Sequence, residues 1–388
     1  MRVNIELLFA YEKRKFYIFY LSVIIKEKQG INMIIKLTQA HIIGAFVSYL
    51  IGVFIVPLVI EFSQKEGLVD LPNERKIHKL PISRLGGVAI WSSAMLTFLI
   101  LVLLSYYPYG SLLSGILLGG SLMFLLGLVD DVYNLNAKFK LVIQLSIATI
   151  VYLLGVQIDT IFNPLGGVIP LGWLSYPITI LWIVGISNAV NFIDGVDGLA
   201  GSVISVSSIT LALIAVAITP AQPITALIAF ILAGSMLAFL TFNFNPAKIF
   251  MGDSGALFSG FLLATLSIAG VMKGAALAVL LPFLVLAVPI MDITYSSLRR
   301  IMKGKSPFVA DAEHIHHKLL KAGFSQKKTV AILTSVAIVG GAVATYFTGA
   351  LKNYFIYIAV LLLIMIILSV ISVMTKPQPI EPHEEHHE

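Results

Sequence analysis

The feature that most restricts what this chain can fold into is a series of long apolar runs separated by short breaks. A run of about 17–25 apolar residues can cross the hydrocarbon core of a bilayer as a helix, and we identify about eleven such runs. The breaks, such as 219–223 and 243–246, carry proline, asparagine and glutamine, which are typical of turns. The sequence therefore predicts an all-α polytopic membrane protein. The predicted spans are Ile42–Phe62, Gly86–Tyr106, Leu112–Val129, Leu141–Val156, Leu174–Val190, Leu199–Ile218, Ile224–Phe242, Ala256–Met272, Ala275–Ile293, Val330–Phe347 and Tyr354–Met374.

Composition supports the same class and excludes several kinds of chemistry. Of the 388 residues, 58% are hydrophobic and only 12% are charged, whereas soluble domains carry roughly 25% charged residues. The chain contains no cysteine, which excludes disulfides, thiolate metal ligands and cysteine nucleophiles. The formal net charge is +6, and in a membrane protein basic residues report topology first. The lipid bilayer is thus an expected partner, and nucleic acid is not.

The distribution of lysine and arginine predicts the orientation. Loops on one face hold most of the basic residues from residue 65 onward, whereas loops on the other face hold only Lys273 and Lys352. By the positive-inside rule the crowded face is cytoplasmic, so the N-terminus lies outside and the C-terminus lies inside. The outer segment 159–172 contains short β-prone pieces around Gly166-Gly167, which predicts a small external β-hairpin near 160–171.

The domain organisation is expected to be simple. Residues 42–374 form a single integral membrane domain, and residues 375–388, which end in HEEHHE, form a flexible cytoplasmic tail. Residues 1–41 form an N-terminal extension. Either Met33 is the native start, or this segment is an amphipathic anchor at the membrane interface.

Six aspartates lie at the ends of the apolar runs, and counting spans places all of them on the cytoplasmic face. A carboxylate near the hydrocarbon boundary is expensive to keep and usually serves a function. The group indicates a site for a divalent cation and phosphate, although Asp292 is the member with the weakest claim. The six are Asp130, Asp131, Asp194, Asp197, Asp253 and Asp292.

Two of these segments carry the strongest pattern. The adjacent carboxylates of Asp130 and Asp131 repel each other, and a bound cation or lysine relieves that repulsion; Asn134 and Lys140 follow them. At the end of the fifth predicted span, polar side chains recur every three residues and form one stripe of a helix, after which glycines allow close approach to a ligand. That stripe consists of Asn188, Asn191, Asp194 and Asp197.

Basic and histidine-containing loops complete the predicted site. The first cytoplasmic loop presents Asn73, Lys76, His78 and Arg84 beside prolines and the pair Gly86-Gly87, a pattern that suits phosphate binding. The last loop carries His314, His316 and His317, which are expected to donate hydrogen bonds to a diphosphate rather than to bind zinc. The GDSG string at 252–255 is found in serine proteases, but here it lies between two spans, so a protease is excluded.

Five motifs in this order resemble the polyprenyl-phosphate N-acetylhexosamine-1-phosphate transferases over residues 42–374. The resemblance implies transfer of a sugar 1-phosphate from a UDP-sugar to undecaprenyl phosphate in the bacterial cytoplasmic membrane, with release of UMP. The His-Ile-His-His pattern is similar to the UDP-GlcNAc branch, whereas the branch that uses UDP-MurNAc-pentapeptide usually has three consecutive histidines. The motifs are DLPNERKIHKLPISRLGG, GLVDD, NAVNFIDGVDGLAG, FMGDSG and HIHH.

The resemblance also implies roles for individual residues. Asp253 and Asn191 would bind Mg²⁺, with Mn²⁺ as a substitute ion, and Asp130 and Asp131 would form the catalytic centre. Lys140 and the histidines would contact diphosphate, and Asp194 and Asp197 would serve the nucleotide and the metal. Direct attack and a covalent aspartyl intermediate both remain open, and the sequence allows a homodimer without specifying one.

The rival from another functional class is an ion-coupled transporter. A transporter that relays ions through carboxylates would carry them near the middle of its spans. Here the middle of each span is almost uncharged and the acids lie at the inner ends. The sequence therefore favours the enzyme.

Overall fold

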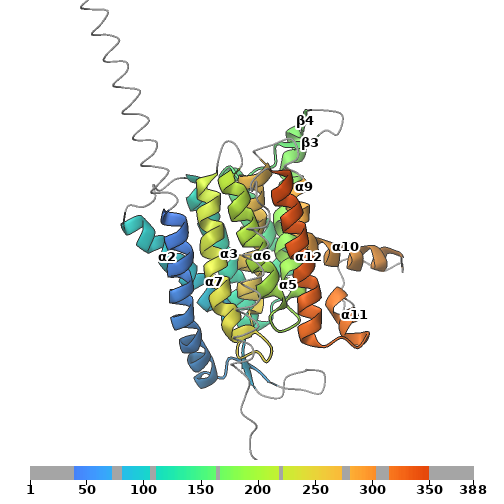
Figure 1. Cartoon of the computed structure of the whole chain (residues 1–388). Helices are drawn as coiled ribbons and strands as arrows, with labels where there is room; N and C mark the ends of the chain where they lie inside the picture. Colours follow the sequence, from blue (N-terminus) through green and yellow to red (C-terminus); the bar gives the residue numbers. More distant parts are fainter. Residues whose placement is uncertain are drawn as a thin grey trace, which may run out of the picture.

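The computed structural model describes residues 39–71, 81–104, 111–162, 167–217, 222–272, 280–302 and 314–348, and these form a helical bundle (Figure 1). An N-terminal helix covers Gln39–Lys65. The later helices are α2 (Gly86–Leu103), α3 (Ser111–Tyr133), α4 (Ala137–Leu153), α5 (Ser175–Ile193), α6 (Leu199–Ala217), α7 (Pro223–Asn243), α8 (Gly252–Leu266), α9 (Leu280–Val285), α10 (Ala287–Met302), α11 (Ile315–Lys321) and α12 (Gln326–Phe347), with a 3₁₀ turn η1 (Gly172–Leu174) and a π-helical turn η2 (Ser267–Met272).

In the described part of the chain, eight helices are long and apolar enough to cross a membrane. They coincide with predicted spans one to three, five to eight and ten. The fourth predicted span is the 17-residue helix α4, which begins four residues earlier than predicted. The last predicted span, Tyr354–Met374, and both termini lie outside the described residues. The fold class is confirmed as all-α and polytopic, while the total of about eleven spans stays a prediction.

The ninth predicted span, Ala275–Ile293, is wrong as one continuous helix. From residue 280 onward the structure has a short α9, a break at Leu286, and then α10. Proline at position 289 cannot donate the helical hydrogen bond to the Val285 carbonyl oxygen, and the Ser207 hydroxyl of α6 donates to that oxygen instead, at 2.8 Å. The freed carbonyl is thus satisfied by a neighbouring helix, and the chain changes direction.

The two sides of α10 differ, and the helix runs across the bundle rather than along it (Figure 1). Met291, Leu298 and Met302 are exposed on one side, whereas Asp292 and Ser296 are buried on the other. Apolar residues on one face and buried polar residues on the opposite face fit a helix at the edge of the hydrocarbon region better than a spanning helix.

The predicted hairpin is confirmed, and its position outside the membrane stays a prediction. Strand β3 (Thr160–Phe162) pairs antiparallel with β4 (Val168–Pro170), with Ile161 opposite Ile169. The hairpin lies at the opposite end of the bundle from α11 (Figure 1). A second, unpredicted pair, β1 (Val69–Asp70) and β2 (Ile82–Ser83), lies between the N-terminal helix and α2.

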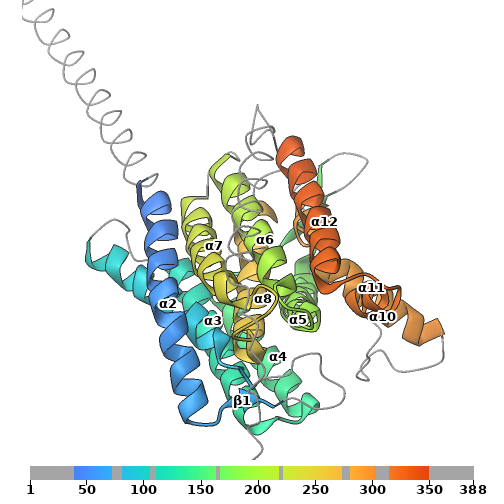
Figure 2. The ribbon, with the colours of Figure 1, turned by 60° about the horizontal axis from the view of Figure 1, so that its bottom comes forward.

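Helix α8 forms the centre of the bundle, packed against α2, α3, α5, α6 and α7 (Figure 2). Its residues from Ser254 to Leu266 are all buried. Small residues bring its neighbours close: a Cβ on Gly87 of α2 would lie 2.2 Å from the Gly255 backbone nitrogen, and one on Gly127 of α3 would lie 2.5 Å from the Asp253 carbonyl carbon. Close packing of this kind stabilises helix association in membranes, where lipid is as apolar as the side chains.

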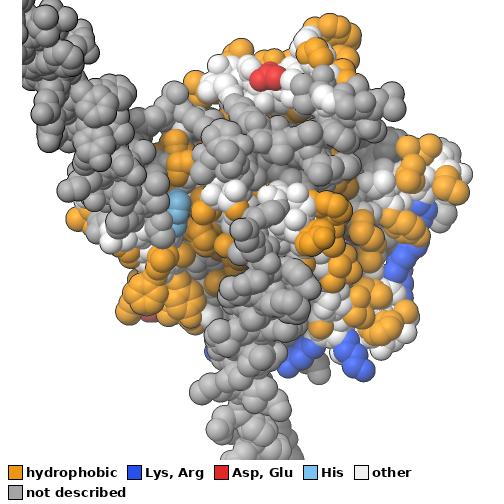
Figure 3. Space-filling model, turned by 45° about the horizontal axis from the view of Figure 1, so that its top comes forward, with side chains coloured by type: hydrophobic (Ala, Val, Ile, Leu, Met, Phe, Trp, Pro, Cys, Tyr) orange, Lys and Arg blue, Asp and Glu red, His pale blue; other side chains and the backbone are white. Residues whose placement is uncertain are grey.

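The outer surface matches a bilayer environment. Hydrophobic side chains cover much of the described surface, and lysine and arginine gather near α10 to α12 (Figure 3). On the N-terminal helix, every fourth residue from 42 to 62 is an exposed apolar residue. These are Ile42, Phe46, Leu50, Phe54, Leu58 and Phe62.

The α2–α8 contact gives a stability prediction. We expect Gly87→Ala to destabilise the protein by about 1–3 kcal/mol, because the new methyl group would meet backbone atoms that no rotamer change can move. Gly185→Ala in α5 is the matched control, since a Cβ there meets nothing within 4 Å. Thermal unfolding in detergent measures both variants, and an equal fall in the two midpoints would contradict the packing argument.

Candidate active site

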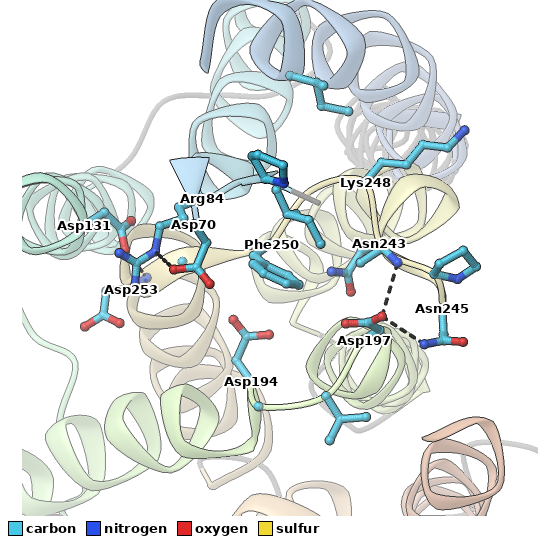
Figure 4. Close-up of a pocket in the computed structure, with 18 of the residues that line it drawn as sticks. Asp70, Arg84, Asp131, Asp194, Asp197, Asn243, Asn245, Lys248, Phe250 and Asp253 are labelled. Carbon is cyan, nitrogen blue, oxygen red and sulfur yellow. Dashed lines mark hydrogen bonds and ion pairs between the residues drawn. The ribbon is translucent and has the colours of Figure 1, made fainter. Parts of the chain in front are cut away.

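A cavity of about 930 Å³ opens among the ends of the helices and the connections between them. Asp131, Asp253 and Arg84 lie on one side, and Asp197, Asn243 and Asn245 lie on the other (Figure 4). Asp194 lies between them. Other lining residues include Asp70, Asn191, Lys248, Phe250, His317 and Gln326. The cavity therefore gathers residues from segments that are far apart in the sequence.

Beside the cavity, backbone hydrogen bonds join the start of α2 directly to the connection that precedes α8. Phe250 N–H donates to the Ser83 carbonyl oxygen at 2.7 Å, Gly86 N–H donates to the Phe250 carbonyl at 2.9 Å, and Gly87 N–H donates to the Met251 carbonyl at 2.8 Å. Gly252 then turns the chain with φ of 69°, a left-handed conformation that glycine adopts readily. These contacts set where Asp253 emerges.

Asp131 is hydrogen-bonded to the N-terminus of α8. One of its carboxylate oxygens accepts from Asp253 N–H at 2.7 Å, and the other accepts from Ser254 N–H at 3.0 Å and from the Ser254 hydroxyl at 2.6 Å. The first N–H groups of a helix have no partner within the helix and favour negative charge. Asp131 therefore fixes the first turn of α8, which carries Asp253.

Asp130, the other member of the adjacent pair, points elsewhere. Lys140, from the first turn of α4, places its ammonium group 2.8 Å from Asp130 Oδ2 and also contacts Asp253. Asp130 Oδ1 accepts from Leu135 N–H at 2.7 Å. Lys140 thus lies between the carboxylates of Asp130 and Asp253, and of these three residues only Asp253 lines the cavity. The repulsion expected between Asp130 and Asp131 is relieved because the two carboxylates have separate partners.

The polar stripe after the fifth predicted span divides in the structure. Asn188 forms a reciprocal amide pair with the buried Gln144 of α4, with Asn188 Nδ2 donating at 2.8 Å, and it does not line the cavity. Asn191 and Asp194 do line it. Burial, together with the nearby carboxylates of Asp253, Asp131 and Asp197, raises the pKa of the Asp194 carboxyl well above its usual range.

The far wall of the cavity is a network around Asp197. Its Oδ2 accepts from Asn245 Nδ2 at 3.0 Å and from Ala247 N–H at 3.2 Å, and Asn245 also contacts Gln326 at the start of α12. Asn243 accepts from Gly198 N–H at 2.9 Å. These amides were not predicted as site residues, although Asn243 and Asn245 stand in the break 243–246 of the sequence.

Asp70 was also not predicted as a site residue. It is 8% exposed and lines the cavity, and its carboxylate lies 3.4 Å from Arg84 Nε. Strands β1 and β2 bring the two together. Arg84 therefore has an acidic neighbour. Asp70 is visible in the sequence, but its pairing with Arg84 is not.

The three histidines do not share one role. His314 binds Asp292, with Nδ1 at 2.7 Å from Oδ2. His316 is 1% exposed, and neither of its ring nitrogens has a partner among the described residues; burial lowers the pKa of His316 to about 4. Of the three, only His317 lines the cavity. Burial and the neighbouring charges of His314 and Lys321 lower the pKa of His317, so its ring favours the neutral form.

The remaining predicted residues lie away from the cavity or outside the described part of the chain. Asn134 is exposed, does not line the cavity, and ends α3 with φ of 51°, a left-handed conformation that asparagine tolerates. Asn73, Lys76 and His78 lie outside the described residues.

Known proteins match this chain over most of its length. The family model for glycosyl transferase family 4 matches residues 113–271. A probable undecaprenyl-phosphate N-acetylglucosaminyl 1-phosphate transferase of Bacillus subtilis is 34% identical over 329 residues, which is 83% of this chain and 90% of the relative. The chain belongs to the polyprenyl-phosphate N-acetylhexosamine-1-phosphate transferases.

Two further relatives extend the comparison of this transferase. A decaprenyl-phosphate N-acetylglucosaminephosphotransferase of Mycobacterium leprae is 32% identical over 335 residues, covering 79% of this chain and 82% of the relative. An undecaprenyl-phosphate alpha-N-acetylglucosaminyl 1-phosphate transferase of Escherichia coli O157:H7 is 27% identical over 286 residues, covering 71% and 75%.

The oxygen-rich lining of the transferase fits a hard divalent cation. Asp253, Asn191 and Asp194 present carboxylate and amide oxygens to one cavity. Within the described residues no group of three histidine, aspartate or glutamate side chains is placed to hold a metal ion by itself. Mg²⁺ commonly takes one or two protein carboxylates and completes its shell with water and substrate phosphate oxygens, so the residues present suit an ion that arrives with a diphosphate.

The contacts of Asp131 give a second prediction. We expect Asp131→Asn to lower the stability by about 1–3 kcal/mol, because the amide nitrogen must face donors at the start of α8. Asp253→Asn is the matched control, since it makes the same change on a side chain that contacts Lys140 and does not cap the helix. Thermal unfolding of the two variants in detergent tests this, and a midpoint for Asp131→Asn no lower than that of the control would refute the capping role.

Proposed function

We propose that this transferase moves GlcNAc 1-phosphate from UDP-GlcNAc to undecaprenyl phosphate, releasing UMP and forming undecaprenyl-diphospho-GlcNAc. The names of the relatives from Bacillus subtilis and Escherichia coli support the acceptor and the transferred group. The observation that carries the proposal is the contact of Lys140 with both Asp130 and Asp253. Of these three residues Asp253 lines the cavity, together with Arg84 and His317. Carboxylates and cations together suit phosphoryl transfer between two anions.

The reaction joins two negatively charged groups, so charge neutralisation is the first requirement. An oxygen of the lipid phosphate attacks the sugar-bearing phosphorus of the donor, and the bond from that phosphorus to UMP breaks. Arg84, Lys140 and the neutral His317 ring would bind the phosphates by hydrogen bonds and charge. Mg²⁺ bound by Asp253 and Asn191 would neutralise charge on the diphosphate.

Asp130 is the group that we propose orients the lipid phosphate. The second pKa of a phosphate monoester is about 6, so at neutral pH the acceptor is largely ionised and needs little deprotonation. Asp131 is committed to the N-terminus of α8 by three hydrogen bonds. We therefore propose that Asp131 positions Asp253 rather than acting as a second base, and that transfer occurs by direct attack.

The membrane context fits a lipid acceptor. Eight helices in the described ranges are long and apolar enough to cross a membrane, which fits a multi-pass membrane protein. The cavity lies at helix ends, so a phosphate at the membrane surface reaches it while its hydrocarbon tail stays in the bilayer. We propose that this is the cytoplasmic face of the bacterial cytoplasmic membrane and that residues 42–374 form the single transferase domain. Carboxylates at helix ends instead of mid-span argue against an ion-coupled transporter.

The activity predicts a direct assay. Purified transferase with UDP-GlcNAc, undecaprenyl phosphate and Mg²⁺ should release UMP, and chelation of the ion should stop release. Asp253→Ala should lower kcat/KM by about 100-fold or more, a loss typical of removing a group that stabilises transition-state charge. Gly185→Ala is the control and should retain full activity. The proposal would be refuted if the wild type released no UMP, or if Asp253→Ala released UMP at the wild-type rate.

The sugar donor is tested by competition. We expect UDP-GlcNAc to be used at least tenfold more efficiently, in kcat/KM, than UDP-MurNAc-pentapeptide, a discrimination of about 1.4 kcal/mol. The comparison needs both donors in one reaction, with the two lipid products separated by chromatography. Preferential use of the pentapeptide donor would move the transferase to the peptidoglycan branch and leave the reaction type intact.

A further inference from the structure

Asp292 is a buried carboxylate outside the cavity, and it had the weakest predicted claim to function among the six aspartates. It is 2% exposed and lies on the inward side of α10. Its Oδ2 lies 2.7 Å from His314 Nδ1, and its Oδ1 accepts from Ile315 N–H at 2.7 Å. Both oxygens are thus used on the segment that begins α11.

These two contacts fix the start of α11 in position and orientation. Ile315 is the first residue of α11, so its N–H has no partner within the helix, and Asp292 supplies that partner from another helix. An ionised carboxylate only accepts hydrogen bonds, so Nδ1 is the His314 nitrogen that donates in this contact. The His314 ring is therefore held in one orientation.

The orientation of His314 is passed on through contacts between rings. The His314 ring lies parallel to that of His316, with 5.8 Å between centroids, and the His316 and His317 rings are tilted by 48° with centroids 4.2 Å apart. Phe192 of α5 also stacks on the His314 ring, with 5.3 Å between centroids. A Cβ on Gly195 would lie 2.6 Å from His316 Nε2, so this ring fits directly against the backbone beside Asp194. The last ring of the series, His317, reaches the cavity.

We propose that Asp292 is a positioning residue, which acts through His314 and the start of α11 to place His317 against the donor diphosphate. This inference rests on the proposed function, because it takes UDP-GlcNAc as the donor. Asp292 touches neither the cavity nor the substrate; its role is to set the place of a side chain that does. A purely structural pair would stabilise α10 and α11 without a specific link to His317.

A double-mutant cycle on donor affinity separates these roles. The four proteins are the wild type, Asp292→Ala, His317→Ala and the double variant, each purified in detergent, with the Kd for radiolabelled UDP-GlcNAc measured by equilibrium dialysis in the presence of Mg²⁺. We expect each single variant to weaken binding about tenfold, the size of coupling found between residues of one contact network. In the His317→Ala background we expect Asp292→Ala to add less than threefold.

Two further variants complete the test. Asp292→Asn should keep Kd within threefold of the wild type, because its amide can accept from Ile315 N–H and donate to His314 Nδ1 with the ring in its other tautomer. Tyr295→Phe removes a contact between α10 and Lys318 of α11 on the exposed side, and it should leave Kd unchanged.

The outcomes distinguish the two proposals. Equal losses from Asp292→Ala in both backgrounds would mean that Asp292 only stabilises the fold, and this would overturn the inference. Unchanged binding in Asp292→Ala, or unchanged binding in His317→Ala, would overturn it as well. Failure of the wild type to bind UDP-GlcNAc would instead count against the proposed function.

Discussion

The hydrogen bonds from the N-terminus of α8 to the Asp131 carboxylate determine the geometry of the site. Helix α8 is buried on all sides, so its first N–H groups need partners from the protein. Asp131 at the end of α3 supplies them. Asp253 emerges from that same turn, beside Lys140 of α4 and within reach of Asp130. Helices α3, α4 and α8 meet at Asp253. Arg84, Asn191 and Asp194 line the same cavity.

Much of the fold could be predicted from hydrophobic length alone, because a helix in lipid must be apolar over about 20 residues. The outer hairpin was predictable from β-prone residues around two glycines. The break between α9 and α10 was not, since the stretch is apolar enough to span. Pro289 is visible in the sequence, but proline occurs within spanning helices, and here the deciding fact is that Ser207 of another helix satisfies the freed carbonyl.

The residues that line the site were predictable as charges in an apolar chain, but their separate roles were not. Asp130 and Asp131 are neighbours in sequence and point to different partners, because successive residues of a helix face directions about 100° apart. Asn188 belongs to the same three-residue stripe as Asn191, yet it pairs with Gln144. Strand pairing brings Asp70 to the cavity, and a turn brings Asn245 there. Neither position follows from charge or from the helical period.

Motion at the site is restricted unequally by the way its walls are joined. Where α2 begins, backbone meets backbone: Gly86 and Gly87 donate to the chain ahead of α8, and no side chain separates Gly87 from Gly255. Packed side chains can adapt by changing rotamer, whereas two backbones in contact cannot. The backbone segments that carry Arg84 and Asp253 are therefore held rigidly to each other. The start of α11 is held instead by a single side chain, Asp292, which contacts the His314 ring and accepts from Ile315 N–H. Amide exchange should therefore be slowest where α2 meets α8 and faster at the start of α11.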